Sequence, residues 1–257
     1  MLLSENRLRL IQRFIGRAVR FRAGRFFAVS LLWLSFFSSQ VYAFPITEKG
    51  QALQRFLRSQ KVESLWQPHQ YINWKTGEQI FPSEQEIEDQ HLQNFSHCSA
   101  YVAALASRLA VPFLNAETSP QGNMLLANNQ NIWLHSEQAV AKGWASTDEI
   151  QAQRLANQGD FVVASIRNEN PHKPGHIAIV VPDDQLTETE LEESGPTVTQ
   201  AGSPSEKVPQ GNTLATDTVS AFDHHTHGTL EGIEFFEHEI DFDRLIDDLP
   251  SKQLPQK

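Results

Sequence analysis

The chain has 257 residues, with 21 basic side chains, 31 acidic ones and a net charge of −10. This balance excludes nucleic acid as a natural partner, because an acidic protein is repelled by a phosphate backbone. Only one cysteine is present, which excludes an intramolecular disulfide.

Residues 1–43 have the composition of an export signal. Seven arginines fall between Arg7 and Arg25 against one acid, and an apolar run, 26–37, follows. Small or modest residues at positions −3 and −1 predict cleavage after Ala43. An uncleaved anchor is the alternative, although an apolar run of about a dozen residues is short of the ~20 that span a bilayer. We expect an exported protein, periplasmic first and secreted second, with no membrane contact after cleavage.

The mature chain would keep 14 of the 21 basic residues and 30 of the 31 acidic ones, a net charge of −16. We expect a single domain over 44–250, which contains an acidic insertion at 183–195 and a mobile loop at 203–221. The Ser, Pro, Thr and Gly content of 203–221 is the basis for the loop. A disordered tail is expected at 251–257.

An amphipathic pattern predicts a helix that starts near residue 46 and contains Leu53 and Leu57 on its apolar side. The aromatic residues that follow, Trp66, Tyr71 and Trp74, have two interpretations. They line a groove, or they pack in the core, as Trp and Tyr in small exported domains more often do.

The only cysteine begins the most clearly patterned helix. Cys98, Tyr101, Val102, Leu105 and Leu109 follow the spacing of one buried stripe, and the helix is expected to end before the proline at 112. A first-turn position favours a thiolate, because the backbone N–H groups and the helix dipole point there. The other interpretation is a small core residue.

Helices are predicted next at 124–144, with Ile132 and Val140 facing inward, and from Thr147 or Asp148 to Gly159. The sequence then favours strands.

Strands are predicted at 160–166 and from His176 to 182, with a turn between them. His176, Ala178 and Val180 share one face of the second strand. We expect this histidine, at a strand start among small residues, to meet the end of a helix. A last strand is expected at 233–240 and a short helix at 242–249.

Three short motifs in this order resemble the papain-like cell-wall hydrolases, the superfamily of the NlpC-type endopeptidases and CHAP amidases. The motifs are Cys98–Val102 (CSAYV), Gly159–Val162 (GDFV) and Gly175–Val180 (GHIAIV). The resemblance implies an α+β, papain-like fold, in which a central helix bearing the cysteine packs on an antiparallel sheet bearing the histidine.

The resemblance also implies a catalytic unit. Cys98 is the nucleophile and His176 the general base, as amide hydrolysis by a thiol requires. Backbone N–H groups at the helix start, with Ser99 and His97, are expected to form oxyanion or positioning contacts.

A third polar residue orients the histidine in this superfamily, from the strand that follows it. Gln200 is the candidate, because an antiparallel strand at 196–202 places it beside His176. Asp183 and Asp184 are the alternatives, although they lie at the far end of the His176 strand.

The expected function is that of an exported cysteine amidase or endopeptidase acting on peptidoglycan stem peptides, as a monomer with no cofactor and no metal. One alternative is a catalytically inactive wall-binding module of the same fold. Another is a metal-carrying exported protein that uses the histidines at 224, 225 and 227, with His238 nearby, because imidazoles bind zinc or copper well.

Overall fold

The computed structural model describes most of the chain between residues 44 and 243. The described residues are 44–66, 70–73, 78–89, 98–115, 118–119, 126–170, 172–173, 175–201, 217–218 and 230–243. All of them belong to one unit, Gln40–Lys257. The expected signal peptide, most of the expected loop at 203–221 and the expected tail lie outside them.

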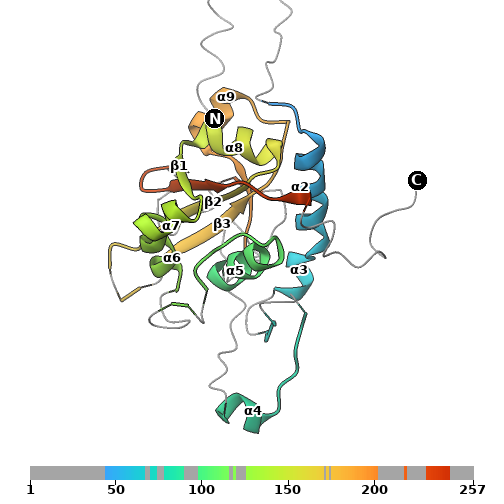
Figure 1. Ribbon diagram of the computed structural model, residues 1–257, viewed down its shortest axis with the longest axis vertical. Coiled ribbons are helices and arrows are strands. Elements are labelled where there is room, and N and C mark those ends of the chain that lie inside the picture. The colour runs from blue at the N-terminus through green and yellow to red at the C-terminus, as the bar shows by residue number, and fades with distance from the viewer. Residues whose placement is uncertain are drawn as a thin grey trace, which may run out of the picture. The chain divides into compact units, whose positions relative to one another are not determined.

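An antiparallel sheet of six strands forms the centre of the described structure, in the order β1-β6-β2-β3-β4-β5 (Figure 1). Its strands are β1 (Ala145–Thr147), β2 (Phe161–Ile166), β3 (His176–Val180), β4 (Thr197–Thr199), β5 (Asp217–Thr218) and β6 (Glu234–His238). The helices are α2 (Glu48–Ser59), α3 (Val62–Leu65), α4 (Glu84–Asp89), α5 (Cys98–Arg108), α6 (Leu126–Leu134), α7 (Glu137–Ala141), α8 (Glu149–Gln158) and α9 (Glu188–Ser194). The expected α+β class is confirmed.

The two faces of the sheet carry different helices. On one face Tyr101 and Leu105 of α5 pack with Ile177 and Ile179 of β3 in a single buried cluster. A second cluster holds buried alanines of α8 together with the residues of β3 that alternate with those isoleucines, including Ala178. The strand alternation expected for β3 is therefore present, and α5 and α8 lie on opposite faces.

The strands around β3 fix the register near the expected site. Ile166 of β2 pairs with His176, and Ile179 pairs with Thr199 of β4. The segment expected to lie beside the His176 strand is thus confirmed as its antiparallel neighbour. The acidic segment before it contains α9, whose N-terminus is closed by a reciprocal capping box between Thr187 and Glu190.

Helix α5 ends in a Schellman motif. The N–H of Val111 donates to the carbonyl of Ala106, and the N–H of Ala110 donates to the carbonyl of Ser107. Ala110 occupies the left-handed position of this motif with φ 53°. The helix therefore ends before Pro112, as the sequence predicts.

Helix α6 buries amide side chains as well as Leu126 and Leu134. Asn128, Gln130 and Asn131 are at most 5% exposed, whereas Ile132 is 51% exposed. The expectation that Ile132 and Val140 face inward is wrong. The amide side chains bond backbone carbonyls and polar groups of other segments, and they therefore share the inward side of α6 with the two leucines. In α7 Ala139 takes the buried position, and Val140 points to solvent.

Trp66 packs in the core, because it is 1% exposed and its ring meets Tyr101 edge-on at 5.1 Å. For Trp66, core packing is therefore the correct interpretation and the groove is not. Tyr71 is partly exposed, and Trp74 lies outside the described residues.

Asn157, the buried penultimate residue of α8, joins three segments. Its Nδ2 donates to the carbonyls of Phe44 and Asp183, both at 2.8 Å, and its Oδ1 accepts from the N–H of Asp183 at 2.8 Å. The guanidinium of Arg154 lies 4.4 Å from the centre of the Phe44 ring. The first described residue is therefore held by both its backbone and its side chain.

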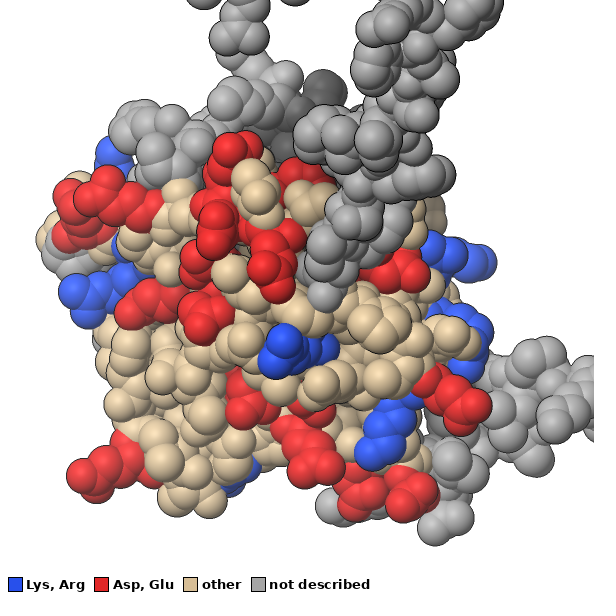
Figure 2. Space-filling view, turned by 90° about the horizontal axis from the view of Figure 1, so that it is seen from above, with Lys and Arg blue, Asp and Glu red and all other residues tan. Residues whose placement is uncertain are grey.

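On the face seen in Figure 2 acidic side chains lie in several groups among uncharged residues, and the basic ones are scattered. Among the described residues, no helix is both long and apolar enough to cross a bilayer.

Candidate active site

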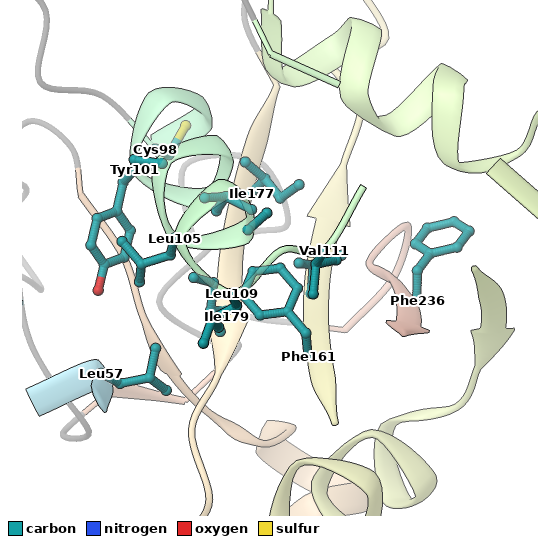
Figure 3. Close-up of a cluster of buried hydrophobic side chains, with 14 of the residues drawn as sticks. Leu57, Cys98, Tyr101, Leu105, Leu109, Val111, Phe161, Ile177, Ile179 and Phe236 are labelled. Atoms are coloured by element: carbon teal, nitrogen blue, oxygen red, sulfur yellow. The ribbon is translucent and has the colours of Figure 1, made fainter. Parts of the chain in front are cut away.

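Cys98 is the first residue of α5, and its thiol lies against β3. The backbone N–H groups of Ile177, Ser99 and Cys98 itself lie near enough to the sulfur to favour its charged form. The side chain points from the start of α5, with Ile177 close by (Figure 3). The residue is buried, at 9% exposed. The helix start thus faces the beginning of the strand that His176 opens.

Burial raises the pKa of the Cys98 thiol above its ordinary value, although the three backbone N–H groups act in the opposite direction. The thiolate expected from the helix start is therefore wrong for this structure. In this packed position the loss of hydration destabilises a charged sulfur more than the three backbone N–H groups stabilise it. Cys98 is a neutral thiol at neutral pH.

His176 is paired with Gln200. The imidazole Nε2 donates to the Oε1 of Gln200. Burial lowers the pKa of His176, with the Gln200 bond opposing the shift, so the ring is neutral at pH 7. Because an amide oxygen only accepts, the proton of this neutral ring sits on Nε2 and Nδ1 carries the lone pair. Nδ1 has the protonation state that a general base needs.

The register explains how Gln200 reaches the histidine. Thr199 pairs with Ile179, so Gln200 follows opposite Ala178 and lies diagonally across from His176. Gln200 is 5% exposed. The alternative, Asp183, is occupied elsewhere, because its Oδ2 accepts from the Thr197 hydroxyl at 2.7 Å. The structure thus brings together His176 and Gln200.

His176 was expected to meet the cysteine helix on the face of β3 that it shares with Ala178. That expectation is wrong. Strand alternation places His176 with Ala178, but α5 packs on the face of Ile177 and Ile179. At the beginning of β3 the part of the chain near the Cys98 sulfur is instead the backbone N–H of Ile177, the residue after His176. His176 is the first residue of its strand and is partly exposed.

Of the two residues expected to contact the oxyanion, the structure describes Ser99 but not His97. Ser99 is 3% exposed, and its backbone N–H acts to lower the pKa of the Cys98 thiol. Its carbonyl accepts from the Nε2 of Gln130 at 3.0 Å. His97 lies outside the described residues.

Sequence reasoning missed Asn128 and Gln130, which contact the segments that carry His176 and Cys98. The signal available was the run Asn128-Asn129-Gln130-Asn131 inside a predicted helix. Three of these four amides are asparagines, which are poor helix formers, so the run indicates that buried polar partners hold them in the helix.

The histidine cluster at 224, 225 and 227 lies outside the described residues. His238 is described, and both of its ring nitrogens contact backbone carbonyls: Nδ1 that of Glu239 at 2.6 Å and Nε2 that of Lys142 at 2.8 Å. Neither nitrogen is therefore oriented for a metal. Within the described ranges no three His, Cys, Asp or Glu side chains gather as metal ligands.

Comparison with known proteins returned no match, whether against protein-family models, curated proteins or solved structures.

Proposed function

We propose that the protein is a cysteine amidase or endopeptidase of papain-like architecture, which hydrolyses an amide bond in peptidoglycan stem peptides. One observation carries the proposal. The only cysteine of the chain opens a helix whose first turn contacts the beginning of β3, where a neutral His176 is held by Gln200. A thiol, a base and an orienting amide are the groups that thiol-based amide hydrolysis requires.

The protonation states define the resting site as a neutral pair rather than an ion pair. When substrate binds, Nδ1 of His176 accepts the thiol proton as the Cys98 sulfur attacks the carbonyl carbon. Gln200 then stabilises the imidazolium through Nε2–H. The imidazolium protonates the leaving amine, and water, activated by the same histidine, hydrolyses the thioester. The backbone N–H groups at the start of α5 are the donors for the oxyanion.

The substrate class rests on the resemblance and on the expected export signal. A net charge of −16 after cleavage disfavours nucleic acid and anionic membranes as partners. The acidic surface in Figure 2 agrees with that charge. We propose a periplasmic location first and secretion second, with the protein acting as a monomer.

One observation favours a second candidate, a wall-binding module of the same fold without catalysis. Burial raises the pKa of Cys98, and among the described residues the groups that oppose this shift are backbone N–H groups. A cysteine that serves only in packing has such surroundings.

The deciding experiment is mass analysis of muropeptides after incubation with the purified protein, with Cys98→Ser as the control. New fragments that carry a free amine and appear only with the wild-type protein support the enzyme. If sacculi bind the protein but release no fragment, the wall-binding module is the correct function. If fragments appear with both proteins, Cys98 is not the nucleophile.

A further inference from the structure

Helix α6 contacts both halves of the candidate site. It packs against α5, β2 and β3. Asn128 and Gln130 are two positions apart on this helix, so their side chains leave it in nearly opposite directions. Each is buried, and each bonds a different segment of the site.

Gln130 holds the first turn of the cysteine helix. Its Nε2 donates to the carbonyl of Ser99, the residue after Cys98, and to the carbonyl of Leu114, both at 3.0 Å. The Gln130 side chain has no exposed surface. The start of α5 is therefore held to α6 by a hydrogen bond beside Cys98, in addition to the packing of its apolar stripe.

Asn128 holds the turn that leads into His176. Its Oδ1 accepts from the N–H of Asn168 at 3.1 Å, and its Nδ2 donates to the carbonyl of Lys173 at 2.9 Å. One carboxamide therefore bridges the two ends of the connection between β2 and β3. The first of these residues lies just after β2, and the second lies three positions before His176.

The residue before the histidine also packs on Asn128. A Cβ at Gly175 would lie 2.6 Å from the Oδ1 of Asn128 and 2.2 Å from the carbonyl oxygen of Ile166. No side chain fits in that space, so the backbone at Gly175 approaches α6 as closely as it can. The entry of the chain into His176 is thereby fixed against Asn128.

We propose that Asn128 and Gln130 are positioning residues, and that one turn of α6 sets the placement of His176 relative to Cys98. This inference rests on the proposed function, because it assigns these residues to the same Cys98–His176 pair. Neither side chain touches the reacting atoms. Each acts through the backbone segment that it holds, as placement of reacting groups to within an ångström requires.

The test compares Asn128→Leu and Asn128→Asp with a matched control, Asn131→Leu. Asn131 is a buried amide on the same helix, but its Nδ2 bonds the side chains of Ser165 in β2 and Glu234 in β6 and not the connection that leads into His176. We expect Asn128→Leu to lower kcat about 10²-fold with KM changed less than about twofold. Asn128→Asp keeps the acceptor for the Asn168 N–H and should recover part of the loss. Asn131→Leu should lower Tm but keep kcat within about twofold.

The proposal is overturned if kcat falls equally in Asn128→Leu and Asn131→Leu, or if it follows Tm across the three variants. Where Asn128→Leu does not fold, the same comparison is made with Asn128→Asp.

A second readout does not need the proposed activity. The rate at which iodoacetamide alkylates Cys98 is measured against pH in the wild-type protein, in His176→Ala and in the Asn128 variants. If the pair is positioned by α6, Asn128→Leu shifts the profile toward that of His176→Ala, whether or not any wall fragment is cleaved. An Asn128→Leu profile equal to wild type overturns the positioning role. A wild-type profile equal to that of His176→Ala also overturns it, because the two groups then do not interact.

Discussion

The hydroxyl of Tyr101 lies 3.0 Å from the hydroxyl of Thr199, so the helix that begins with Cys98 is hydrogen-bonded to the strand that leads into Gln200. Both side chains are fully buried. We expect Tyr101→Phe and Thr199→Val to be coupled, with an interaction energy of about 1 kcal/mol in a double-mutant cycle. Urea unfolding of the four proteins measures it. Additive losses would show that the hydroxyl pair contributes no stability of its own.

Cys98→Ser and His176→Ala should each abolish turnover without unfolding the protein. They remove members of one unit, so we expect each loss to be about 10³-fold or more and the double variant to be no slower than the single ones. Steady-state hydrolysis of purified wall fragments measures this, and circular dichroism shows that the variants are folded. Substantial activity in the serine variant would show that Cys98 is a packing residue and not the nucleophile.

Gln200→Ala should lower kcat more mildly than either of these changes. Its Oε1 orients the ring through Nε2–H and makes no bond to the substrate. Asp183→Ala serves as the comparison, because Asp183 bonds Thr197 and not the histidine. Unchanged kinetics in Gln200→Ala with a large loss in Asp183→Ala would assign the orienting role to Asp183.

Alkylation of Cys98 should need a higher pH in the folded protein than in the unfolded chain. Burial raises the pKa of the thiol, so the reactive thiolate forms only above the ordinary value of about 8.5. Iodoacetamide rates across pH 6–10, with and without guanidinium, measure the difference. The linked stability is fully present below about pH 8.5 and is lost as the pH rises further. A folded-state profile below that of the unfolded chain would contradict this.

Asp160 makes the protein more stable in mild acid. Burial, then the charges of Glu237 and Glu239, raise the pKa of its carboxyl to about 6. A raised folded-state pKa contributes stability below about pH 4, the unfolded value, and that contribution is lost as the pH rises through 6. We expect Asp160→Asn to unfold at higher urea than wild type at pH 8, by about 1 kcal/mol after solvent screening, and equally at pH 4.

Substitution of the exposed Glu192 by Gln is the control for that experiment. It should leave the difference between pH 4 and pH 8 as it is in the wild-type protein. A pH-independent effect of Asp160→Asn would show that the carboxyl loses no stability on ionisation.

Ala110→Gly should stabilise the protein by about 0.5–1 kcal/mol. Ala110 has φ 53° at the left-handed position that ends α5, where a Cβ is unfavourable and glycine is not. Thermal unfolding measures the gain, with Ala100→Gly, inside the same helix, as the opposite case. A lower Tm for Ala110→Gly would mean that the methyl group contributes more through packing than it costs in backbone strain.

Local pattern predicted the elements that carry the site. The apolar stripe after Cys98, the short β runs around His176 and the alternation along β3 are properties of neighbouring residues, and the structure has them as expected. The three-residue strand β1 and helix α9 were missed, because a strand of Ala145–Thr147 and a helix rich in glutamate have little apolar pattern.

The errors have a common physical cause, which is contact between segments distant in sequence. Periodicity assigned Ile132 to the inward side of α6, but amides such as Asn128, which bonds a backbone group 45 positions away, are buried there. The ionisation of Cys98 depends on how deeply the first turn of α5 is buried against β3, which the helix position alone does not determine. The face of His176 depends in the same way on which side α5 docks.

The bonds of Asn157 also bear on the order in which the protein folds. The carbonyl of Phe44 accepts a hydrogen bond from an amide 113 residues later in the chain. During synthesis from the N-terminus, Phe44 cannot reach this amide until α8 has been made, and the Asn157 side chain gains its bonds to Asp183 only later still. Because such long-range closure is slow, we expect the first residues of the described structure to be among the last to reach their native contacts.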